Sequence, residues 1–319
     1  MPLPLVAVTR RLPAACETRL DALFRVRWGD DATDYDAARM LALAEGADAL
    51  LVSAGDPVPA AVIAKLPASV KVISTFSVGT DHIDIKAAKA RGIYVGNTPG
   101  VLTDATADIA LLLMLAAMRR AGEGERLVRA GKWTGWRPTQ LMGTHLSGKT
   151  LGIVGLGRIG AATARRAKAF GMNIAYHSRR PVPEAETLQA RYFANLDDML
   201  PQVQVLSLHC PLTPETKGLV NARRLALLPK GAIVINTARG GSVIDEDLIA
   251  ALTSGHIAAA GLDVYANEPN LHPGYLNLEN AVLLPHLGSA TTETRAAMGL
   301  RAIENISAVL AGNPPVYGV

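Results

Sequence analysis

Three side chains that suit proton transfer and anion binding each come shortly after an apolar run of the chain. They are Arg239, Glu268 and His286. Histidine changes charge near neutral pH and suits general acid/base work, a carboxylate can orient it, and arginine offers a rigid fork of donors to a carboxylate. Taken singly, each could be a structural histidine, a turn residue or a surface cation. Together they predict a site that binds a carboxylic acid and transfers a proton.

A glycine-rich turn ahead of these residues is typical of dinucleotide binding. The apolar run 150–154 predicts a buried strand, Gly155-x-Gly157-x-x-Gly160 follows it, and 161–170 reads as a helix. The first glycine permits a tight turn, the second lets a pyrophosphate approach the backbone, and the third lets helix and strand pack closely. The helix N-terminus then favours the phosphates. The alternative is an ordinary glycine turn, but the strand–turn–helix context favours a dinucleotide cofactor.

The segment after the next expected strand predicts which dinucleotide is used. Sites specific for NAD carry an acidic residue there, about 20 residues beyond the glycines. The corresponding position falls near Ser178, which is followed by Arg179 and Arg180, with no carboxylate. A hydroxyl and two guanidinium groups suit a 2′-phosphate. We therefore expect NADP(H) in preference to NAD(H), with NAD(H) use still possible; the alternative is a solvated basic turn.

Strands and helices alternate along the whole chain. Strands are expected at 5–9, 49–53, 70–75 and 92–96, and again at 173–177, 203–209, 232–236, 258–264 and 281–284, with helices such as 14–23 between them. This alternation predicts an α/β fold of doubly wound parallel sheets, Rossmann-like or flavodoxin-like. Ligands of such sheets bind beyond the carboxyl ends of the strands, so the three chemical side chains are expected to converge on one crevice.

The glycine turn lies about halfway along the 319 residues, so a separate domain must fold from the residues before it. We expect a discontinuous substrate-binding domain, 1–98 plus 290–319, which the last helix, 291–311, completes. The dinucleotide-binding Rossmann domain, 99–289, is then inserted between its two parts. The two crossings predict a hinge, and the cleft between the domains is expected to hold the substrate.

Composition excludes several function classes. The net charge is +4, but the basic residues are scattered and aromatic residues make up only 4%, which argues against a nucleic-acid groove. Cys16 and Cys210 are too few for a disulfide framework or a zinc site, and we expect no metal and two buried thiols. The longest apolar run, 109–118, is too short to span a bilayer, and no secretory signal is visible. We therefore expect no membrane partner and a cytoplasmic location.

An ordered series of segments identifies a family. The segments are 76–84, 103–108, 155–160, 209–216, 236–240, 263–269 and 285–288. Through them the chain resembles the D-isomer-specific 2-hydroxyacid dehydrogenases over essentially its whole length. Within that family, Trp133-Thr-Gly-Trp136-Arg-Pro makes it most similar to the glyoxylate/hydroxypyruvate reductases. The resemblance implies homodimers in which Trp133 and Trp136 either contact the partner's active site or simply pack at the interface.

The resemblance also implies a role for each residue. His286 is the acid/base, Glu268 its partner and Arg239 the substrate clamp, while Val78 and Gly79 present backbone N–H groups to the substrate carboxylate. Asp263 would meet the nicotinamide amide. The cofactor contacts implied are Thr106, Gly155, Leu156, Gly157, Arg158, Ile159, Gly160, Ser178, Arg179, Arg180, Cys210, Pro211, Thr216, Thr237, Ala238, Asp263 and Gly288.

The expected activity is NADPH-dependent reduction of glyoxylate or hydroxypyruvate to the D-2-hydroxy acid, with hydride delivered to C2 and a proton from His286. Other members of the family, of the phosphoglycerate or D-lactate type, are alternatives. A formate dehydrogenase fits less well because that branch pairs its histidine with glutamine. A dinucleotide-sensing corepressor is the alternative outside enzymes, and the joint presence of His286, Glu268 and Arg239 favours an enzyme.

Overall fold

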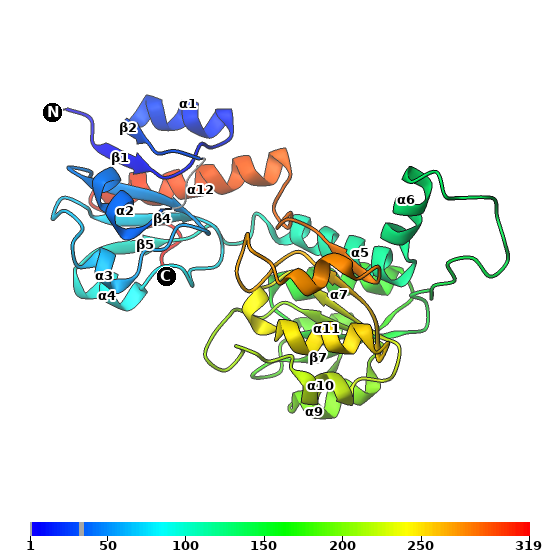
Figure 1. Ribbon diagram of the computed structural model, residues 1–319. Helices are drawn as coiled ribbons and strands as arrows, with labels where there is room; N and C mark the ends of the chain where they lie inside the picture. The colour runs from blue at the N-terminus through cyan, green and yellow to red at the C-terminus, as the bar shows by residue number, and fades with distance from the viewer. Residues whose placement is uncertain (1, 32–34) are drawn as a thin grey trace. The chain divides into compact units, whose positions relative to one another are not determined.

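The computed structural model describes residues 2–31 and 35–319, which form two compact units (Figure 1). The terminal unit comprises Met1–Leu102 and Ala290–Val319, and the central unit comprises Thr103–Ser289. The chain therefore passes between the units twice, at Leu102–Thr103 and at Ser289–Ala290. The first of these crossings lies a few residues beyond the boundary expected from sequence, because the turn 97–102 stays with the terminal unit.

The terminal unit contains a five-stranded parallel sheet with strand order β2-β1-β3-β4-β5. Its strands are β1 (Leu5–Val8), β2 (Arg25–Trp28), β3 (Ala49–Ser53), β4 (Val72–Phe76) and β5 (Tyr94–Gly96). From β1 the chain first adds β2 on one side and then moves to β3 on the other. The carboxyl ends of β1 and β3 therefore flank the switch point at which such sheets bind ligands.

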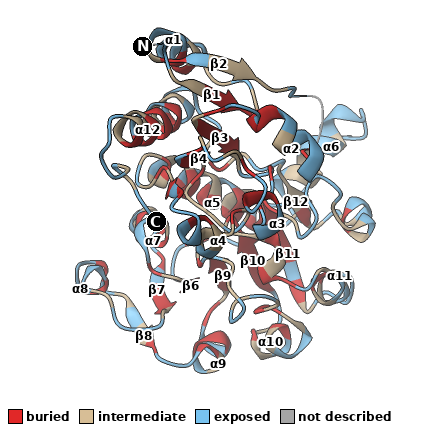
Figure 2. Cartoon of the chain, turned by 90° about the vertical axis from the view of Figure 1, so that its left-hand side faces the viewer, coloured by how far each residue is buried: buried red, intermediate tan, exposed pale blue. Residues whose placement is uncertain are grey.

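Helices cover both faces of this sheet. α1 (Ala14–Leu23) and α12 (Thr292–Leu310) pack on one face, while α2 (Ala37–Ala44), α3 (Ala60–Ile63) and α4 (Ile85–Ala90) pack on the other. Side chains alternate between the faces, so the central strands β3 and β4 are almost wholly buried (Figure 2). They are mostly apolar, but β4 also buries the polar side chains of Ser74 and Thr75. α12 comes from the far end of the sequence and completes the core of this unit.

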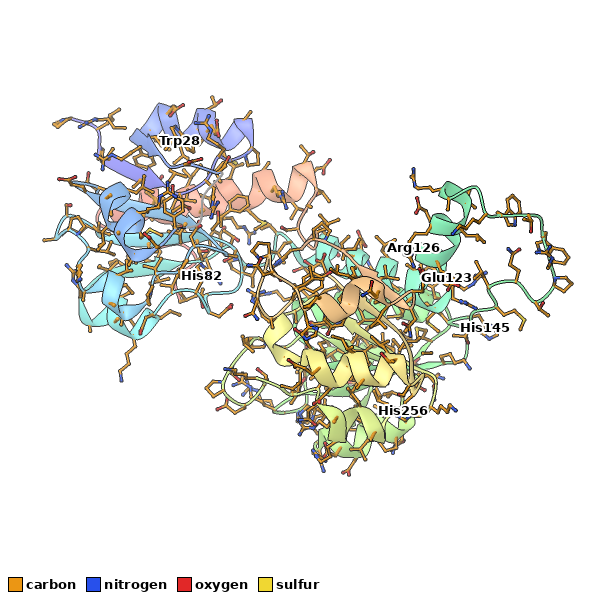
Figure 3. The ribbon with its side chains drawn as sticks, viewed as in Figure 1. Trp28, His82, Glu123, Arg126, His145 and His256 are labelled. Atoms are coloured by element: carbon orange, nitrogen blue, oxygen red, sulfur yellow. The ribbon has the colours of Figure 1, made fainter. Side chains whose placement is uncertain are left out.

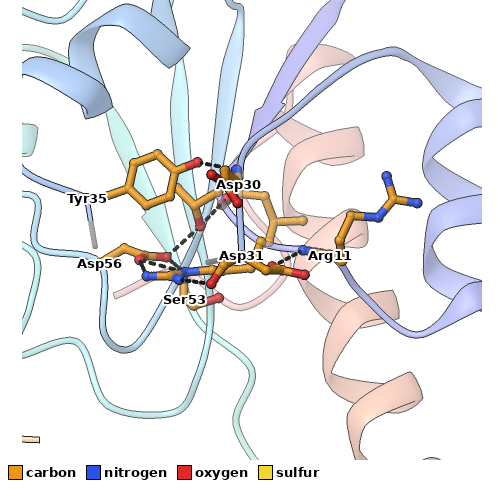
Figure 4. Close-up of polar contacts among 9 residues, drawn as sticks. Arg11, Asp30, Asp31, Tyr35, Ser53 and Asp56 are labelled. Atoms are coloured by element: carbon orange, nitrogen blue, oxygen red, sulfur yellow. Dashed lines mark hydrogen bonds and ion pairs between the residues drawn. The ribbon is translucent and has the colours of Figure 1, made fainter. Parts of the chain in front are cut away.

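A partly buried ion pair joins the carboxyl ends of β1 and β3 (Figure 4). Asp56 is fully buried and binds Arg10 through Nε at 3.0 Å and Nη2 at 2.7 Å. Its other oxygen accepts from the Thr9 hydroxyl at 2.6 Å and from the Ser53 amide at 3.0 Å. With both oxygens satisfied, Asp56 holds the turn after β3 against the end of β1.

The central unit contains a seven-stranded parallel sheet with strand order β12-β11-β10-β9-β6-β7-β8. Its strands are β6 (Thr150–Val154), β7 (Asn173–His177), β8 (Arg191–Phe193), β9 (Val205–Leu208), β10 (Ala232–Asn236), β11 (Ile257–Leu262) and β12 (Ala281–Leu283). The first strand, β6, lies in the interior of the sheet beside β9, so the order reverses between them. The carboxyl ends of these two strands flank the dinucleotide turn.

Two apolar clusters lie on the two faces of this sheet. α5 (Thr103–Met118), α7 (Arg158–Ala169) and α8 (Glu184–Leu188) cover one face. α9 (Leu196–Met199), α10 (Ala222–Leu227) and α11 (Asp245–Thr253) cover the other, and α6 (Ala121–Arg129) follows α5. Short 3-10 helices span Leu200–Gln202, Gly240–Ser242 and Pro273–Asn277.

The α/β fold with two parallel sheets is confirmed, and most expected elements agree with the structure to within one or two residues. Three differences have physical reasons. The edge strands β2 and β8 were missed because they carry charged residues and are short. α7 begins at Arg158 rather than at 161, because the second glycine of the turn is already its N-cap. Both cysteines are buried and free, as expected.

No helix in the described part of the chain is long and apolar enough to cross a membrane. Within the same residues, no group of three or more His, Cys, Asp or Glu side chains is arranged to hold a metal ion.

Candidate active site

The carboxyl ends of β10, β11 and β12 bring Arg239, Glu268 and His286 together in the central unit. The His286 imidazole Nδ1 lies 2.7 Å from the Glu268 Oε2. The positive charge of Arg239 also acts on the Glu268 carboxylate and helps to lower its pKa. The three side chains thus form one electrostatic group, which carries an acid, a base and an anion-binding fork.

Asp263 determines where His286 stands. His286 has a left-handed backbone conformation with φ of 55°, which a residue other than glycine adopts only when its surroundings hold it. The fully buried Asp263 accepts hydrogen bonds from the Leu287 amide at 2.6 Å and from the Gly288 amide at 2.7 Å. Thr106 adds a bond from its hydroxyl to the Gly288 carbonyl at 3.0 Å. Asp263 therefore anchors the turn, a role that sequence reasoning missed.

Glu268 orients the imidazole ring and stabilises its charged form. One carboxylate oxygen accepts from the Tyr265 amide at 2.9 Å and the other binds His286 Nδ1. Burial acts to raise the pKa of Glu268, but the hydrogen bond with His286, its charge and that of Arg239 outweigh burial and leave the pKa below its usual value. Because Nδ1 is occupied, Nε2 is the nitrogen that can face a substrate, and it has no partner among the described residues.

The turn that carries Arg239 is held by its own neighbours. The Asn236 side chain accepts from the Ala238 amide at 3.0 Å and donates to the Arg239 carbonyl at 2.9 Å. Gly240 must lack a side chain, because a Cβ there would lie 1.8 Å from the carbonyl carbon of Tyr265. This close approach joins the turn after β10 to the turn that leads to Glu268.

The glycine turn after β6 fits the pyrophosphate of a dinucleotide. Gly155 has a φ of 94°, and a Cβ on it would lie 2.9 Å from the Cys210 amide nitrogen. A Cβ on Gly160 would lie 2.4 Å from the Gly155 carbonyl oxygen, whereas nothing lies within 4 Å of a Cβ on Gly157. Gly157 is also the N-cap of α7 and offers no capping side chain. Open backbone at an uncapped helix N-terminus is what an anionic phosphate requires.

The end of β7 differs in detail from the expectation. The Ser178 hydroxyl accepts from the Leu156 amide at 3.0 Å, so Ser178 also braces the glycine turn. Arg179 and Arg180 are exposed. Glu215 stands near enough to Arg179 for that charge to lower its pKa, in addition to the stronger effect of a hydrogen bond with Thr213. Sequence reasoning missed Glu215, a carboxylate that competes for Arg179.

The loops after β9 and β10 contribute two threonines of different kinds. The Thr216 hydroxyl donates to the Pro211 carbonyl at 2.7 Å and accepts from the Thr213 amide at 2.7 Å, so Thr216 fastens its own loop. The Thr237 hydroxyl is buried and has no hydrogen-bond partner in the described part of the chain. Buried hydroxyl groups normally have a hydrogen-bond partner, so the Thr237 hydroxyl, directly after β10, fits a site in which a polar ligand supplies that partner.

Val78 and Gly79 belong to the terminal unit, in the turn that follows β4. Both are partly exposed. Side chains that the sequence did not single out hold this turn, among them Asn97 and His82, which is labelled in Figure 3. Each unit thus carries its own group of expected site residues.

Comparison with known proteins gives a consistent result. Residues 111–288 match the family model for the NAD-binding domain of D-isomer-specific 2-hydroxyacid dehydrogenases. The chain is 43% identical over 316 residues to a glycerate dehydrogenase of Hyphomicrobium methylovorum, with 98% of each chain covered. It is 42% identical to a glyoxylate reductase of Thermococcus litoralis, covering 98% of this chain and 95% of that one.

A solved structure extends the likeness to three dimensions. It is the NADPH-dependent glyoxylate/hydroxypyruvate reductase of Sinorhizobium meliloti in complex with NADP and malonate. The TM-score is 0.89 at 37% sequence identity, and the match covers 99% of this chain and 96% of that one.

Replacing His286 with glutamine should raise the pKa of Glu268, because the charge of His286 no longer opposes burial and only Arg239 and the Tyr265 amide still do. The same change should alter how the stability of the protein depends on pH. A carboxylate whose pKa is lowered in the folded state stabilises the protein above its unfolded pKa, and this contribution is lost as pH falls through the folded pKa. The H286Q variant should lose less stability across that acidic range. Titration of ¹³C-labelled carboxyl groups by NMR measures the shift, with Asp197, paired to Arg223 and Arg224, as a control that should not move. An unmoved Glu268 would contradict the pairing.

Proposed function

The chain belongs to the D-isomer-specific 2-hydroxyacid dehydrogenase family, and from this membership we propose that it reduces glyoxylate and hydroxypyruvate to their D-2-hydroxy acids with NADPH. The hydrogen bond of 2.7 Å between His286 and Glu268, beside Arg239, carries the proposal. The relatives support the substrate class, since two of them are named for glyoxylate reduction and one for glycerate, the reduction product of hydroxypyruvate.

We assign the proton transfer to His286. A bound nicotinamide dinucleotide supplies the hydride that C2 of the 2-oxo acid receives. His286 holds a proton on Nε2 and donates it to the carbonyl oxygen as negative charge develops there. Glu268 keeps the ring in place and stabilises the imidazolium before transfer. Arg239 binds the carboxylate and polarises the carbonyl oxygen, and the amides of Val78 and Gly79 bind the carboxylate.

Cofactor binding is assigned to the central unit and substrate binding chiefly to the terminal unit. The open backbone at Gly157 and the first turn of α7 would receive the pyrophosphate. A bound cofactor would supply the hydrogen-bond partner that the buried Thr237 hydroxyl lacks among the described residues. The remaining proposed cofactor contacts are Thr106, Leu156, Arg158, Ile159, Cys210, Pro211, Thr216, Ala238, Asp263 and Gly288.

The preference for NADPH rests on the end of β7. No carboxylate follows this strand directly, and Arg179 and Arg180 are exposed, where they can bind a 2′-phosphate. One related structure contains NADP, which supports the same choice. Glu215 weakens this argument, because its carboxylate lies near enough to Arg179 for the two charges to interact and would repel a phosphate bound there.

We also propose that two copies of the chain associate through α6 and the segment after it. Trp133 is 53% exposed and Trp136 is 78% exposed, and Val128 and Met142 are exposed as well. We call α6 and the segment that follows it, residues 121–145, the arm. Four large apolar side chains of the arm are exposed to solvent, which fits a surface that a second copy of the chain covers.

The wild-type protein should therefore sediment as a dimer, and Trp136→Ser should shift the equilibrium towards monomer at micromolar concentration. Phe170→Ser, which removes another exposed aromatic side chain outside the arm, should leave the dimer intact. A wild-type monomer at the same concentration would refute the proposed association.

Replacing His286 with alanine should lower kcat for glyoxylate by about 10²–10⁴-fold, the usual contribution of a positioned general acid. H286A should slow reduction of the 2-oxo acid and oxidation of the 2-hydroxy acid alike, because the same imidazole gives the proton in one direction and takes it in the other. Initial rates of nicotinamide absorbance change measure both directions. His145→Ala, at an exposed histidine of the arm (Figure 3), should behave as wild type. Near-normal turnover by H286A would remove His286 from this role.

The double variant Arg179→Ala with Arg180→Ala should lower the ratio of kcat/KM for NADPH to that for NADH by about tenfold or more, the loss expected for charge-assisted phosphate contacts. Parallel kinetics with both cofactors measure the ratio. Arg19→Ala with Arg25→Ala removes the same charge from exposed positions of the terminal unit and should leave the ratio unchanged. If the first pair also leaves it unchanged, these arginines form only a solvated basic turn.

A further inference from the structure

Three successive carbonyl groups in the turn after β4 are each held by a partner. The Ser77 carbonyl accepts from the Thr98 amide at 2.9 Å. The Val78 carbonyl accepts from the Asn97 side chain at 2.8 Å, and the Gly79 carbonyl accepts from the Ser77 hydroxyl at 2.6 Å. The orientation of three consecutive peptide planes is thereby determined.

These bonds also determine where the amides of the turn point. In a trans peptide the N–H lies opposite the C=O of the same plane, and none of these three bonds is cis. The amides of Val78, Gly79 and Thr80 therefore point away from the partners that hold the carbonyls. Among the described residues, none of the three donates a hydrogen bond. A run of free backbone amides is an anion-binding arrangement.

A series of hydrogen bonds between the side chains behind this turn can donate in only one direction. The Gly79 carbonyl can only accept, so the single Ser77 hydroxyl proton must go to it. Ser77 Oγ must then accept from Thr75 Oγ1, 2.8 Å away. Thr75 has spent its own proton, so it must accept from His82 Nε2 at 2.9 Å. The carbonyl thus requires that His82 carries a proton on Nε2.

Reversing the direction of these hydrogen bonds would cost free energy, because the hydroxyl groups are buried. Thr75 is fully buried and Ser77 is 6% exposed, so a hydroxyl that lost its partner would have no water to replace it. Hydrogen bonds in such a buried series also polarise and strengthen one another. His82 is held in turn by its own backbone, since its carbonyl accepts from the Val58 amide at 2.8 Å.

We propose that His82 is a positioning residue which, through Thr75 and Ser77, holds the amides of Val78, Gly79 and Thr80 in the orientation that binds the substrate carboxylate. Thr80 thereby supplies a third amide to the two already assigned. The inference rests on the proposed reduction of 2-oxo acids. The chain of donors stands behind the turn and does not touch the reacting atoms, so its effect falls on substrate affinity.

The test compares two buried serines of one strand region. Ser77→Ala removes the bond to the Gly79 carbonyl, whereas Ser74→Ala removes a still more buried bond, from Ser74 Oγ to the Ala302 carbonyl at 3.0 Å, on the α12 side. S77A should raise the KM for glyoxylate about tenfold or more, as expected when charge-assisted hydrogen bonds weaken, with a much smaller change in kcat. The KM for NADPH should not change. S74A should keep both KM values, and Ser77→Thr, which retains a hydroxyl, should restore substrate affinity.

A second pair of variants tests the far end of the chain. His82→Phe keeps the ring but has no donor at the Nε2 position, and should raise the KM for glyoxylate in the same way. His82→Gln, whose amide can donate to Thr75, should recover part of it. Because these variants leave Ser77 intact, they test the chain even if S77A fails to fold.

Binding of oxalate, measured by calorimetry on each folded variant with saturating NADPH, separates the two levels of the argument. A wild type that neither turns over a 2-oxo acid nor binds oxalate would refute the proposed function. An active wild type with unchanged KM and oxalate affinity in S77A and H82F would refute the positioning role alone. Equal losses of affinity in S77A and S74A would also refute it, because the effect would then be one of general stability.

Discussion

A turn that follows a parallel strand has no partner strand to hold its shape, and Arg239, Glu268 and His286 all lie in segments that follow such strands. The fold supplies the missing support with side chains that bind nearby backbone. Asp263 binds the two amides after His286, and Asn236 closes the turn before Arg239. Ser77 and Asn97 do the same for the turn after β4. Without these bonds the strands would still align, but the side chains at their ends would have no defined direction.

The site uses two carboxylates that lie close together and differ because of their surroundings. Asp263 is fully buried, and burial raises its pKa despite the two backbone amides that it accepts. Glu268 is partly exposed and faces a cation, so its pKa is lowered. The first carboxylate therefore serves the backbone, while the second serves the imidazole. Such a division of roles between neighbouring acids arises from environment and not from residue type.

The glycine turn after β6 is also held in shape by close contacts with neighbouring backbone and by one side chain. Gly155 and Gly160 are needed because backbone atoms approach closely, whereas Gly157 faces open space. Ser178, which the sequence offers as a phosphate ligand, already accepts a hydrogen bond from the turn itself. The proposed preference for NADPH therefore rests on the exposed guanidinium groups of Arg179 and Arg180, with Glu215 near Arg179.

The sequence by itself determined the fold class, because buried parallel strands are apolar runs and helices between them show turn and cap residues. Glycine spacing and the order of the motifs also identified His286, Glu268 and Arg239 as one group. The sequence did not reveal that Asp263 anchors the turn after His286, or that Arg10 binds Asp56. It also did not reveal that Asn97 and His82 support the turn after β4. These partners lie far apart in the chain or on opposite sides of a turn, and hydrogen-bond direction depends on atomic positions. Only the tertiary structure decides those, because spacing along the sequence carries no information about which buried donor meets which acceptor.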